Sequence, residues 1–181
     1  MSDFSEADRM VDMQIHPARQ ENRADALRVW RAANVARAVV PSSQRVDRVR
    51  AKLAEEDAVL LIGCVDEKVR AMVLAEPWRE ADGTGPVVGD RGHVSMVFVD
   101  PDYWGRGFGT SMLAVLGEAA VQRGWVRTSL WTRETNHRAR RLYLRACYQP
   151  TGRSSELPNG ERILEFQQTR GSSAGATGAA F

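Results

Sequence analysis

The chain has 181 residues, of which 43% are hydrophobic and 27% charged, with a formal net charge of +2. This length suits one globular domain whose core needs no disulfide or metal. Two cysteines are too few for a disulfide framework, and three histidines far apart in sequence argue against a zinc site. No apolar run approaches the roughly 18 residues of a membrane helix, and the polar N-terminus differs from a signal peptide. We therefore expect a cytoplasmic protein without a bound metal.

The first half of the chain predicts strands and two amphipathic helices. Residues 1–10 are expected to be a disordered lead, and residues 11–170 one domain. Residues 66–68 form a polar turn between two apolar runs, which indicates a hairpin. In chain order, we predict a strand at 13–16, a helix from 22 or 25 to 37, a helix at 43–54, strands at 58–65 and 69–75, a loop at 81–92 and a strand at 93–99.

The second half alternates helices and strands. Gly124 suits the end of a helix, and Asn136 is well placed as an N-cap. Residues 171–181 are expected to be a disordered tail, because their small side chains cannot offset the entropy of ordering. In chain order, we predict a helix from 107 or 109 to 122, a strand at 128–132, a helix at 136–146, and strands at 147–153 and 163–168. This order predicts a mixed sheet covered by helices, in the α/β or α+β class.

Positive charge is concentrated in one segment. Between Trp104 and Arg145 there are eight arginines and two acidic residues, which gives +6 there and −4 elsewhere. Such a segment suits a phosphate-bearing ligand, or it forms a solvated helix face. Nucleic acid is the weaker hypothesis, because aromatic residues are few. The arginines are Arg106, Arg123, Arg127, Arg133, Arg138, Arg140, Arg141 and Arg145.

A glycine-rich turn follows the predicted strand HVSMVFV. The chain continues as DPDYW and GRGFGT before the next helix begins. Glycines let backbone N–H groups converge on an anion, and the helix adds its unpaired first-turn donors and the positive end of its dipole. The pattern therefore predicts a pyrophosphate cradle, with Arg106 adding charge at its edge.

Other nucleotide motifs fit this turn less well. A P-loop would need a Gly-Lys-Ser/Thr sequence, and the turn has no lysine. The dinucleotide fingerprint G-x-G-x-x-G fails because Thr110 stands three residues after Gly107, and because a spacer separates the strand from the glycines. Glu134 favours the dinucleotide alternative, because it lies shortly after the next strand, where an acid that binds the ribose is expected. A plain glycine-rich turn is the third interpretation.

Two blocks of this segment resemble the Gcn5-related N-acetyltransferase (GNAT) superfamily. The first block is the strand ending Val-Asp-Pro at residues 99–101, followed by WGRGFGT at residues 104–110. The second is the strand at 130–132, then Asn136, Leu142-Tyr143 and Cys147-Tyr148. Trp104 replaces the family's opening basic residue, and Cys147-Tyr148 replaces Gly-Phe. The resemblance implies a mixed, mostly antiparallel sheet of six to seven strands with about four helices.

The resemblance also implies that acetyl-coenzyme A is the co-substrate. It would lie between the strand before the glycine turn and the strand after the helix. Asn136 would contact the pantetheine or phosphate arm or serve only as an N-cap, and Arg140 or Arg141 would contact the 3′-phosphate or only solvent. The implied pantetheine contacts are Val97, Phe98 and Val99, and the implied pyrophosphate contacts are Gly105, Arg106, Gly107, Phe108, Gly109 and Thr110.

The implied reaction is acetyl transfer to a primary amine by direct attack in a ternary complex. Tyr143 occupies the family's tyrosine position and would protonate the departing thiolate, unless it is only a core aromatic. A backbone N–H near Val97 would stabilise the oxyanion. The general base would be His93, acting through water, or Glu76, which could instead bind a cationic amine. Strand alternation predicts that His93 and Ser95 share a face with Val97. We do not expect covalent catalysis by Cys147.

Two other functions remain open at this point. A coenzyme A-binding sensor would bind the cofactor without acyl transfer, and a nicotinamide-dependent oxidoreductase would use the glycine turn for a dinucleotide. The acceptor would contact the early helices and the loop at 77–92, and it could be a small molecule or a protein. We expect no nucleic-acid or membrane partner, and a homodimer is possible.

Overall fold

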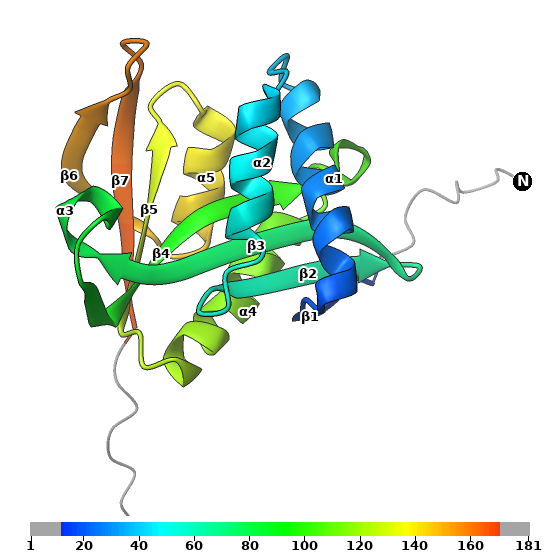
Figure 1. The fold of residues 1–181 in the computed structure, drawn as a ribbon, viewed down its shortest axis with the longest axis horizontal. Coiled ribbons are helices and arrows are strands. Elements are labelled where there is room, and N and C mark those ends of the chain that lie inside the picture. Colours follow the sequence, from blue (N-terminus) through cyan, green and yellow to red (C-terminus); the bar gives the residue numbers. More distant parts are fainter. Residues whose placement is uncertain (1–11, 171–181) are drawn as a thin grey trace, which may run out of the picture.

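A computed structural model describes residues 12–170 as one seven-stranded sheet with helices on both faces (Figure 1). The lead and tail expected at 1–10 and 171–181 lie outside the described residues. The strand order is β1-β2-β3-β4-β5-β7-β6, and only β4 and β5 pair in parallel. The predicted mixed, mostly antiparallel sheet is therefore confirmed. The dinucleotide alternative is wrong, because it requires a doubly wound parallel sheet.

Most of the predicted elements are present with small shifts in their ends. No helix within residues 12–170 is long and apolar enough to cross a membrane. The strands are β1 (Gln14–Pro17), β2 (Val59–Val65), β3 (Lys68–Arg79), β4 (Val87–Val99), β5 (Arg127–Arg133), β6 (Gln149–Glu156) and β7 (Arg162–Thr169). The helices are α1 (Arg23–Val35), α2 (Ser43–Lys52), the short α3 (Glu80–Gly83), α4 (Phe108–Gln122) and α5 (His137–Arg145), with 3₁₀ turns at Gln20–Asn22 and Pro101–Tyr103.

The sheet separates two hydrophobic clusters. Helices α1 and α2 cover one face, whereas α4 covers the other (Figure 1). Trp30 and Met72 are fully buried in the α1–α2 cluster, and Leu116 and Val73 in the α4 cluster. Because consecutive strand residues point to opposite faces, neighbouring residues of β3 contribute to different clusters. Apolar burial on both faces therefore fixes the position of the central strands.

The loop predicted at 81–92 is wrong. β3 continues to Arg79, the short helix α3 follows, and β4 begins at Val87. Pro77, Gly89 and Gly92 weaken the strand signal in the sequence, because these residue types disfavour strands. In the folded chain, the pairing of β3 with β4 extends to Arg79 and Val87 and overrides that local preference.

β4 contains a bulge at Ser95. Leu74 of β3 pairs with Met96, and the next residue, Ala75, pairs with Val94. Ser95 is therefore the extra residue, and its hydroxyl lies 3.5 Å from the carbonyl oxygen of Leu74. A bulge of this kind resets the alternation of side chains along the strand.

The bulge changes which side chains share a face. Val94 and Val97 are three residues apart, yet both pack into the α4 cluster. His93 therefore faces the α1–α2 side, and so does Glu76, which pairs with it across the strands. The prediction that His93 shares a face with Val97 is wrong, because strict alternation cannot anticipate an inserted residue.

β4 and β5 separate after a short parallel ladder. Their pairing covers only Arg91–His93 with Arg127–Ser129, after which β5 pairs with β7 alone. The N–H of Asp100 donates to the carbonyl of Arg70 on β3 at 2.7 Å. By alternation, the main-chain groups of Val97 and Val99 face away from β3 and into the opening. The fold thus leaves part of a strand edge without a neighbouring strand.

Gly92→Ala should destabilise the fold. An ideal Cβ at Gly92 would overlap the indole ring of Trp125, whereas one at Gly89 in the same strand meets no atom within 4 Å. We expect Gly92→Ala to lower the free energy of unfolding by about 1–3 kcal/mol, as overpacking does. Urea denaturation of both variants measures this. Equal stability of Gly92→Ala and Gly89→Ala would contradict the contact.

Candidate active site

The glycine-rich turn presents a row of unbonded N–H groups. Gly105 and Gly107 both have φ of 84°, a left-handed conformation that glycine adopts without strain. Gly107 is the N-cap of α4. Among residues 12–170, none accepts a hydrogen bond from the backbone N–H groups of residues 105–109. Together with the positive end of the α4 dipole, these donors favour a bound anion.

Two details refine the predicted set of cradle residues. The N–H of Thr110 already donates to the carbonyl of Gly107 at 2.9 Å, so only its hydroxyl remains available. Arg106 lies with its guanidinium 5.2 Å from the centre of the Tyr103 ring, and that ring stacks on Phe108 at 5.6 Å. The charge of Arg106 is therefore held at the edge of the cradle.

Arg138 is a basic residue near the cradle that the sequence analysis missed. The indole N–H of Trp104 donates to the carbonyl of Val99 at 2.7 Å, which fixes the ring beside the end of β4. The guanidinium of Arg138, from the first turn of α5, lies 4.2 Å from the centre of that ring. A cation over an indole face is attracted by the ring quadrupole. The two residues are far apart in sequence, so no motif could have indicated the pair.

Several of the other arginines have partners elsewhere. Arg141 is exposed, and no described residue binds its guanidinium. The positive charge of the segment is thus partly neutralised away from the cradle, whereas Arg106 and Arg138 stay beside it. The partnered arginines are Arg127 with Asp90 (3.4 Å), Arg133 with Glu161 (3.2 Å) and Arg140 with the carbonyl of Glu134 (3.1 Å).

Asn136 is the N-cap of α5, as predicted. Its side-chain oxygen accepts a hydrogen bond from the N–H of Ala139 at 3.1 Å. Its side-chain amide group donates to no residue in the described part of the chain. An asparagine has separate acceptor and donor ends, so the capping role leaves two N–H donors available.

Tyr143 is buried near the aromatic rings of Tyr148 and Phe166. The ring centres are 6.3 Å and 6.0 Å away, respectively. Burial raises the pKa of Tyr143 to about 12. The phenol is therefore protonated throughout the physiological range and can donate its proton in a hydrogen bond. Burial thus makes this phenol a weaker acid than an exposed tyrosine.

Glu76 is held by a lysine. Both carboxylate oxygens lie 2.7 Å from Nζ of Lys52, the last residue of α2. Burial acts to raise the pKa of Glu76, but the hydrogen bond and charge of Lys52, aided by Ser95, leave it below its ordinary value. A carboxylate that is paired in this way is a weak base.

His93 is the better placed of the two predicted bases. Its ring lies edge-on to Trp78, with centres 6.0 Å apart. Burial lowers the pKa of His93, although Glu76 acts in the opposite direction. The Nδ1 atom is buried and has no hydrogen-bond partner among the described residues. A neutral imidazole with a free nitrogen can accept a proton near neutral pH.

Cys147 terminates α5 in a left-handed conformation with φ of 64°. This conformation favours glycine at the position, which agrees with the residue that the superfamily usually has there. The thiols of Cys147 and Cys64 are both free. Cys147 is exposed, and no described histidine bonds to it.

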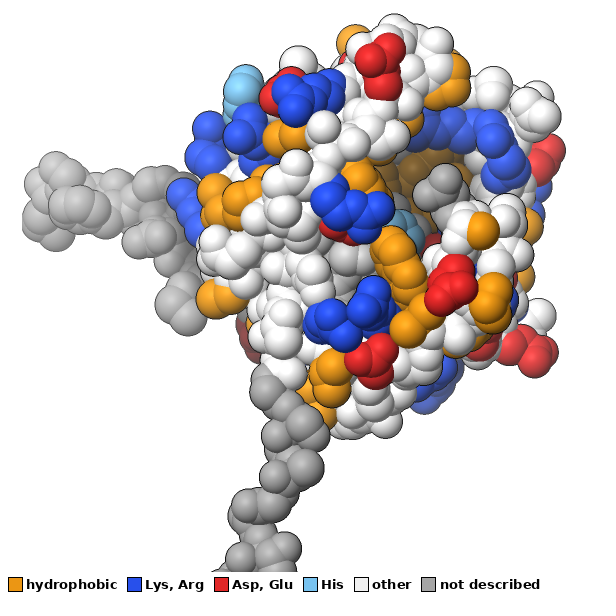
Figure 2. All heavy atoms as spheres, turned by 90° about the vertical axis from the view of Figure 1, so that its left-hand side faces the viewer, with side chains coloured by type: hydrophobic (Ala, Val, Ile, Leu, Met, Phe, Trp, Pro, Cys, Tyr) orange, Lys and Arg blue, Asp and Glu red, His pale blue; other side chains and the backbone are white. Residues whose placement is uncertain are grey.

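The side of the molecule that carries β6 and α3 is hollowed (Figure 2). Hydrophobic side chains lie in its depth and basic side chains along its rim.

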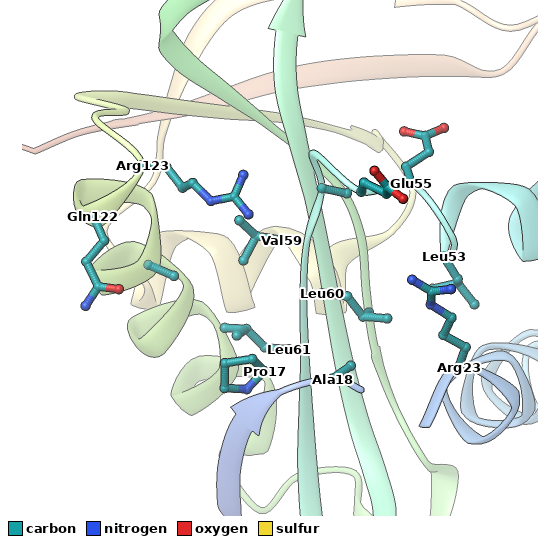
Figure 3. A pocket seen from close by; sticks show the side chains of 13 residues that line it. Pro17, Ala18, Arg23, Leu53, Glu55, Val59, Leu60, Leu61, Gln122 and Arg123 are labelled. Carbon is teal, nitrogen blue, oxygen red and sulfur yellow. The ribbon is translucent and has the colours of Figure 1, made fainter. Parts of the chain in front are cut away.

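A separate pocket of ≈ 390 Å³ is lined by residues of β2, the end of α4 and the segments after β1 and α2 (Figure 3). None of the predicted site residues lines that pocket, so it is distinct from the cradle.

Comparison with solved structures identifies the fold. The ribosomal-protein-S18-alanine N-acetyltransferase from Escherichia coli is 19% identical with a TM-score of 0.71, covering 93% of this chain and 100% of that one. The paia N-acetyltransferase from Thermoplasma acidophilum, in complex with coenzyme A, is 13% identical with a TM-score of 0.62, covering 85% and 98%. The yncA protein from Salmonella typhimurium, with its cofactor acetyl-CoA, is 17% identical with a TM-score of 0.67, covering 92% and 99%.

A family model extends this likeness from the fold to the sequence. No curated protein matches the chain. The model of the acetyltransferase (GNAT) family matches residues 24–147, more than half of the sequence, and these residues run from α1 through the cradle to the end of α5. The chain therefore belongs to the acetyltransferase (GNAT) family and is an acyltransferase.

Proposed function

We propose that this protein transfers an acetyl group from acetyl-CoA to a primary amine by direct attack in a ternary complex. The observation that carries the proposal is the row of unbonded N–H groups at residues 105–109, placed beside the open edge of β4. A cofactor with both a diphosphate and an extended, amide-containing arm matches this arrangement. The solved relatives from Thermoplasma acidophilum and Salmonella typhimurium hold coenzyme A and acetyl-CoA, respectively.

The cofactor would lie along the opening between β4 and β5. The N–H groups of Gly105–Gly109 would bind the pyrophosphate, and the pantetheine arm would pair with the main chain of Val97 and Val99 as an added strand would. The free amide of Asn136 would bind the same arm. Arg138 would supply the positive charge that the family obtains from the position of Trp104. The thioester would then lie beside Val97 and Tyr143.

The residues at the acyl end would stabilise the charges that develop. As the amine attacks the thioester carbonyl, the N–H of Val97 would donate to the oxyanion. When the carbon–sulfur bond breaks, the phenol of Tyr143 would donate to the thiolate. Complete proton transfer from a phenol of pKa about 12 to a thiolate of pKa near 8.5 is uphill by about 5 kcal/mol. Tyr143 would therefore act mainly as a hydrogen-bond donor.

We assign His93, rather than Glu76, as the base. Both face the α1–α2 side, which is where we place the acceptor. Both oxygens of Glu76 are used by Lys52, whereas Nδ1 of His93 is unpartnered among residues 12–170. An amine must lose a proton to attack, and a neutral imidazole can take it directly or through a water molecule. We place the reaction in the cytoplasm, where free thiols such as those of Cys64 and Cys147 remain reduced.

Tyr143→Phe tests the proposed chemistry. We expect the variant to bind acetyl-CoA as the wild type does, and to lose about 100-fold in kcat, because the thiolate loses its donor. Free-thiol release measures turnover across a panel of amines, and a thermal shift measures binding. Tyr148→Phe is the matched control, since it removes a buried hydroxyl that bonds to Thr128 at 2.9 Å and should keep kcat. Binding of acetyl-CoA without turnover by the wild type would favour a sensor.

Arg138→Gln tests the missing basic residue. We expect the dissociation constant for acetyl-CoA to rise about tenfold, as for the loss of a charged hydrogen bond, with little change in kcat. The affinity of the variant should also depend less on salt, because one cation no longer meets the phosphates. Arg145→Gln, on the same helix and exposed, is the control. Equal affinities of the two variants would show that Arg138 does not contact the cofactor.

Lys52→Met tests the assignment of the base. Without Lys52, burial is opposed only by the weaker hydrogen bonds of Ser95 and Glu55, so the pKa of Glu76 should rise, which an NMR titration of the carboxyl carbon measures. The depressed folded-state pKa means that the pair stabilises the fold above the ordinary glutamate pKa, and that this contribution is lost as pH falls through the folded-state value. At neutral pH we expect a loss of about 1–2 kcal/mol, between the values of an exposed ion pair and a charged hydrogen bond.

Arg50→Met provides the control for this experiment. Arg50 lies on the same helix, 2.6 Å from exposed Asp47, and its loss should leave the pKa of Glu76 unchanged. The charge of Lys52 also lowers the pKa of His93, so an NMR titration of the imidazole in the same variant is needed; if His93 is the base, the acidic limb of the pH profile of kcat should follow the pKa of His93. A limb that moves together with the pKa of Glu76 would instead assign the base to Glu76.

A further inference from the structure

Arg37, just after the end of α1, is held in a fixed position by its own helix. Its Nε donates to the carbonyl of Ala33, and its Nη2 donates to the side-chain oxygen of Asn34, both at 3.1 Å. Asn34 is itself buried, and its amide donates to the carbonyl of Trp30 at 2.8 Å. The guanidinium is thus oriented before any ligand arrives, which reduces the entropy lost on binding.

The hydrogen bonds of Arg37 to the end of α1 leave some of its N–H donors without a partner among the described residues. A cation near the last carbonyls of a helix is favourable, and that interaction alone could account for the bond to Ala33. A guanidinium has five N–H donors, and the two hydrogen bonds leave three of them without a partner in the described part of the chain. The remaining donors can form the paired hydrogen bonds that carboxylates and phosphates accept.

No acidic side chain among residues 12–170 forms an ion pair with Arg37. Its charged neighbours are instead arginines from α2 and β5. Burial lowers the pKa of Arg37, and the positive charges of Arg133 and Arg45 lower it further. Arg45 also has no ion pair, whereas Arg133 pairs with Glu161 at the surface. Three separate elements therefore contribute positive charge around Arg37, and of the three arginines only Arg133 has an acidic partner among the described residues.

Arg37 is the central residue of this cluster of Arg37, Arg45 and Arg133, and it lies against Phe98, the residue after Val97, beside which we place the thioester. The guanidinium of Arg37 is 5.5 Å from the centre of the Phe98 ring, on the part of β4 that has lost its neighbour β5. Arg37 and Tyr143 are close enough for each to shift the pKa of the other. An anion bound by Arg37 would consequently lie within a small molecule's length of the reacting amine.

We propose that the acceptor is a small amine that also carries an anionic group, a carboxylate or a phosphate, and that Arg37 binds this group. The inference rests on the proposed acetyl transfer and names the class of its acceptor. It favours amino-acid-like acceptors over polyamines, because a second cation would meet three arginines. Arg37 would thereby determine acceptor specificity, while Tyr143 and His93 act on the reacting atoms.

The test compares acceptors that differ only in the anionic group. The panel contains the common amino acids, their α-amides, the amines formed by removing the carboxylate, and the corresponding aminophosphonates, each with acetyl-CoA and free-thiol detection. We expect the wild type to acetylate an amino acid more efficiently than its amide. Whichever of the carboxylate and the phosphonate acceptors is acetylated more efficiently identifies the anionic group that the site binds. Arg37→Gln should lower kcat/KM for the anionic acceptor about 10- to 100-fold, mainly through KM, and should change the amide little.

The control variants separate binding from other effects of Arg37. Arg31→Gln, exposed on the same helix, should change neither acceptor, and Arg37→Lys should restore part of the activity toward the acid. Each variant is compared with the wild type on the same acceptor, so differences in amine pKa between acid and amide cancel. Thermal unfolding and acetyl-CoA affinity verify that Arg37→Gln is folded.

Two results would overturn the inference. If Arg37→Gln loses the same factor on acid and amide, Arg37 acts through Tyr143 or the fold and not through the acceptor. If the wild type acetylates amides or polyamines as well as acids, the acceptor needs no anionic group. Both results leave acetyl transfer intact. Failure to bind acetyl-CoA and to acetylate any amine would instead refute the proposed function, and the inference with it.

Discussion

The separation of β4 from β5 is the constraint on which the rest of the site depends. Only three residues of each strand pair, and beyond them the main chain of β4 has no neighbouring strand on that side. At the end of that exposed edge, the chain turns through Gly105 and Gly107 and presents its N–H groups. Within residues 12–170, no neighbouring strand or helix uses these backbone groups, although the indole of Trp104 donates to the carbonyl of Val99.

Local sequence patterns predicted the parts of this site that depend on neighbouring residues. The alternating glycines before an apolar helix indicated the cradle, and Asn136 before another indicated an N-cap, because both features need only a few consecutive residues. Arg138 and Arg37 could not be found this way. Their partners are Trp104 and Phe98, which only tertiary packing brings near. Arginines are also abundant in this sequence, so composition could not single them out.

The charges on the side where we place the acceptor depend on tertiary contacts, and residue types alone did not indicate them. Glu76 and His93 were equal candidates in the sequence, and the end of α2 distinguishes them by placing Lys52 against the carboxylate. Glu76 was also a candidate for binding a cationic amine, and Lys52 occupies its carboxylate. The cluster of Arg37, Arg45 and Arg133 argues for an anionic group on the acceptor, because Arg37 lies against Phe98, the residue after Val97.

The extra residue at Ser95 has a consequence for how this gene can change. Val97 contributes to the α4 side and His93 to the opposite side only because one residue interrupts the alternation between them. Deletion of the Ser95 codon alone would restore regular alternation and leave every other side chain of the strand on its present face, because Ser95 is the extra residue. A deletion in a central strand without such an extra residue would instead turn every following side chain over, so the loss of one residue should be better tolerated at the bulge than elsewhere in the sheet.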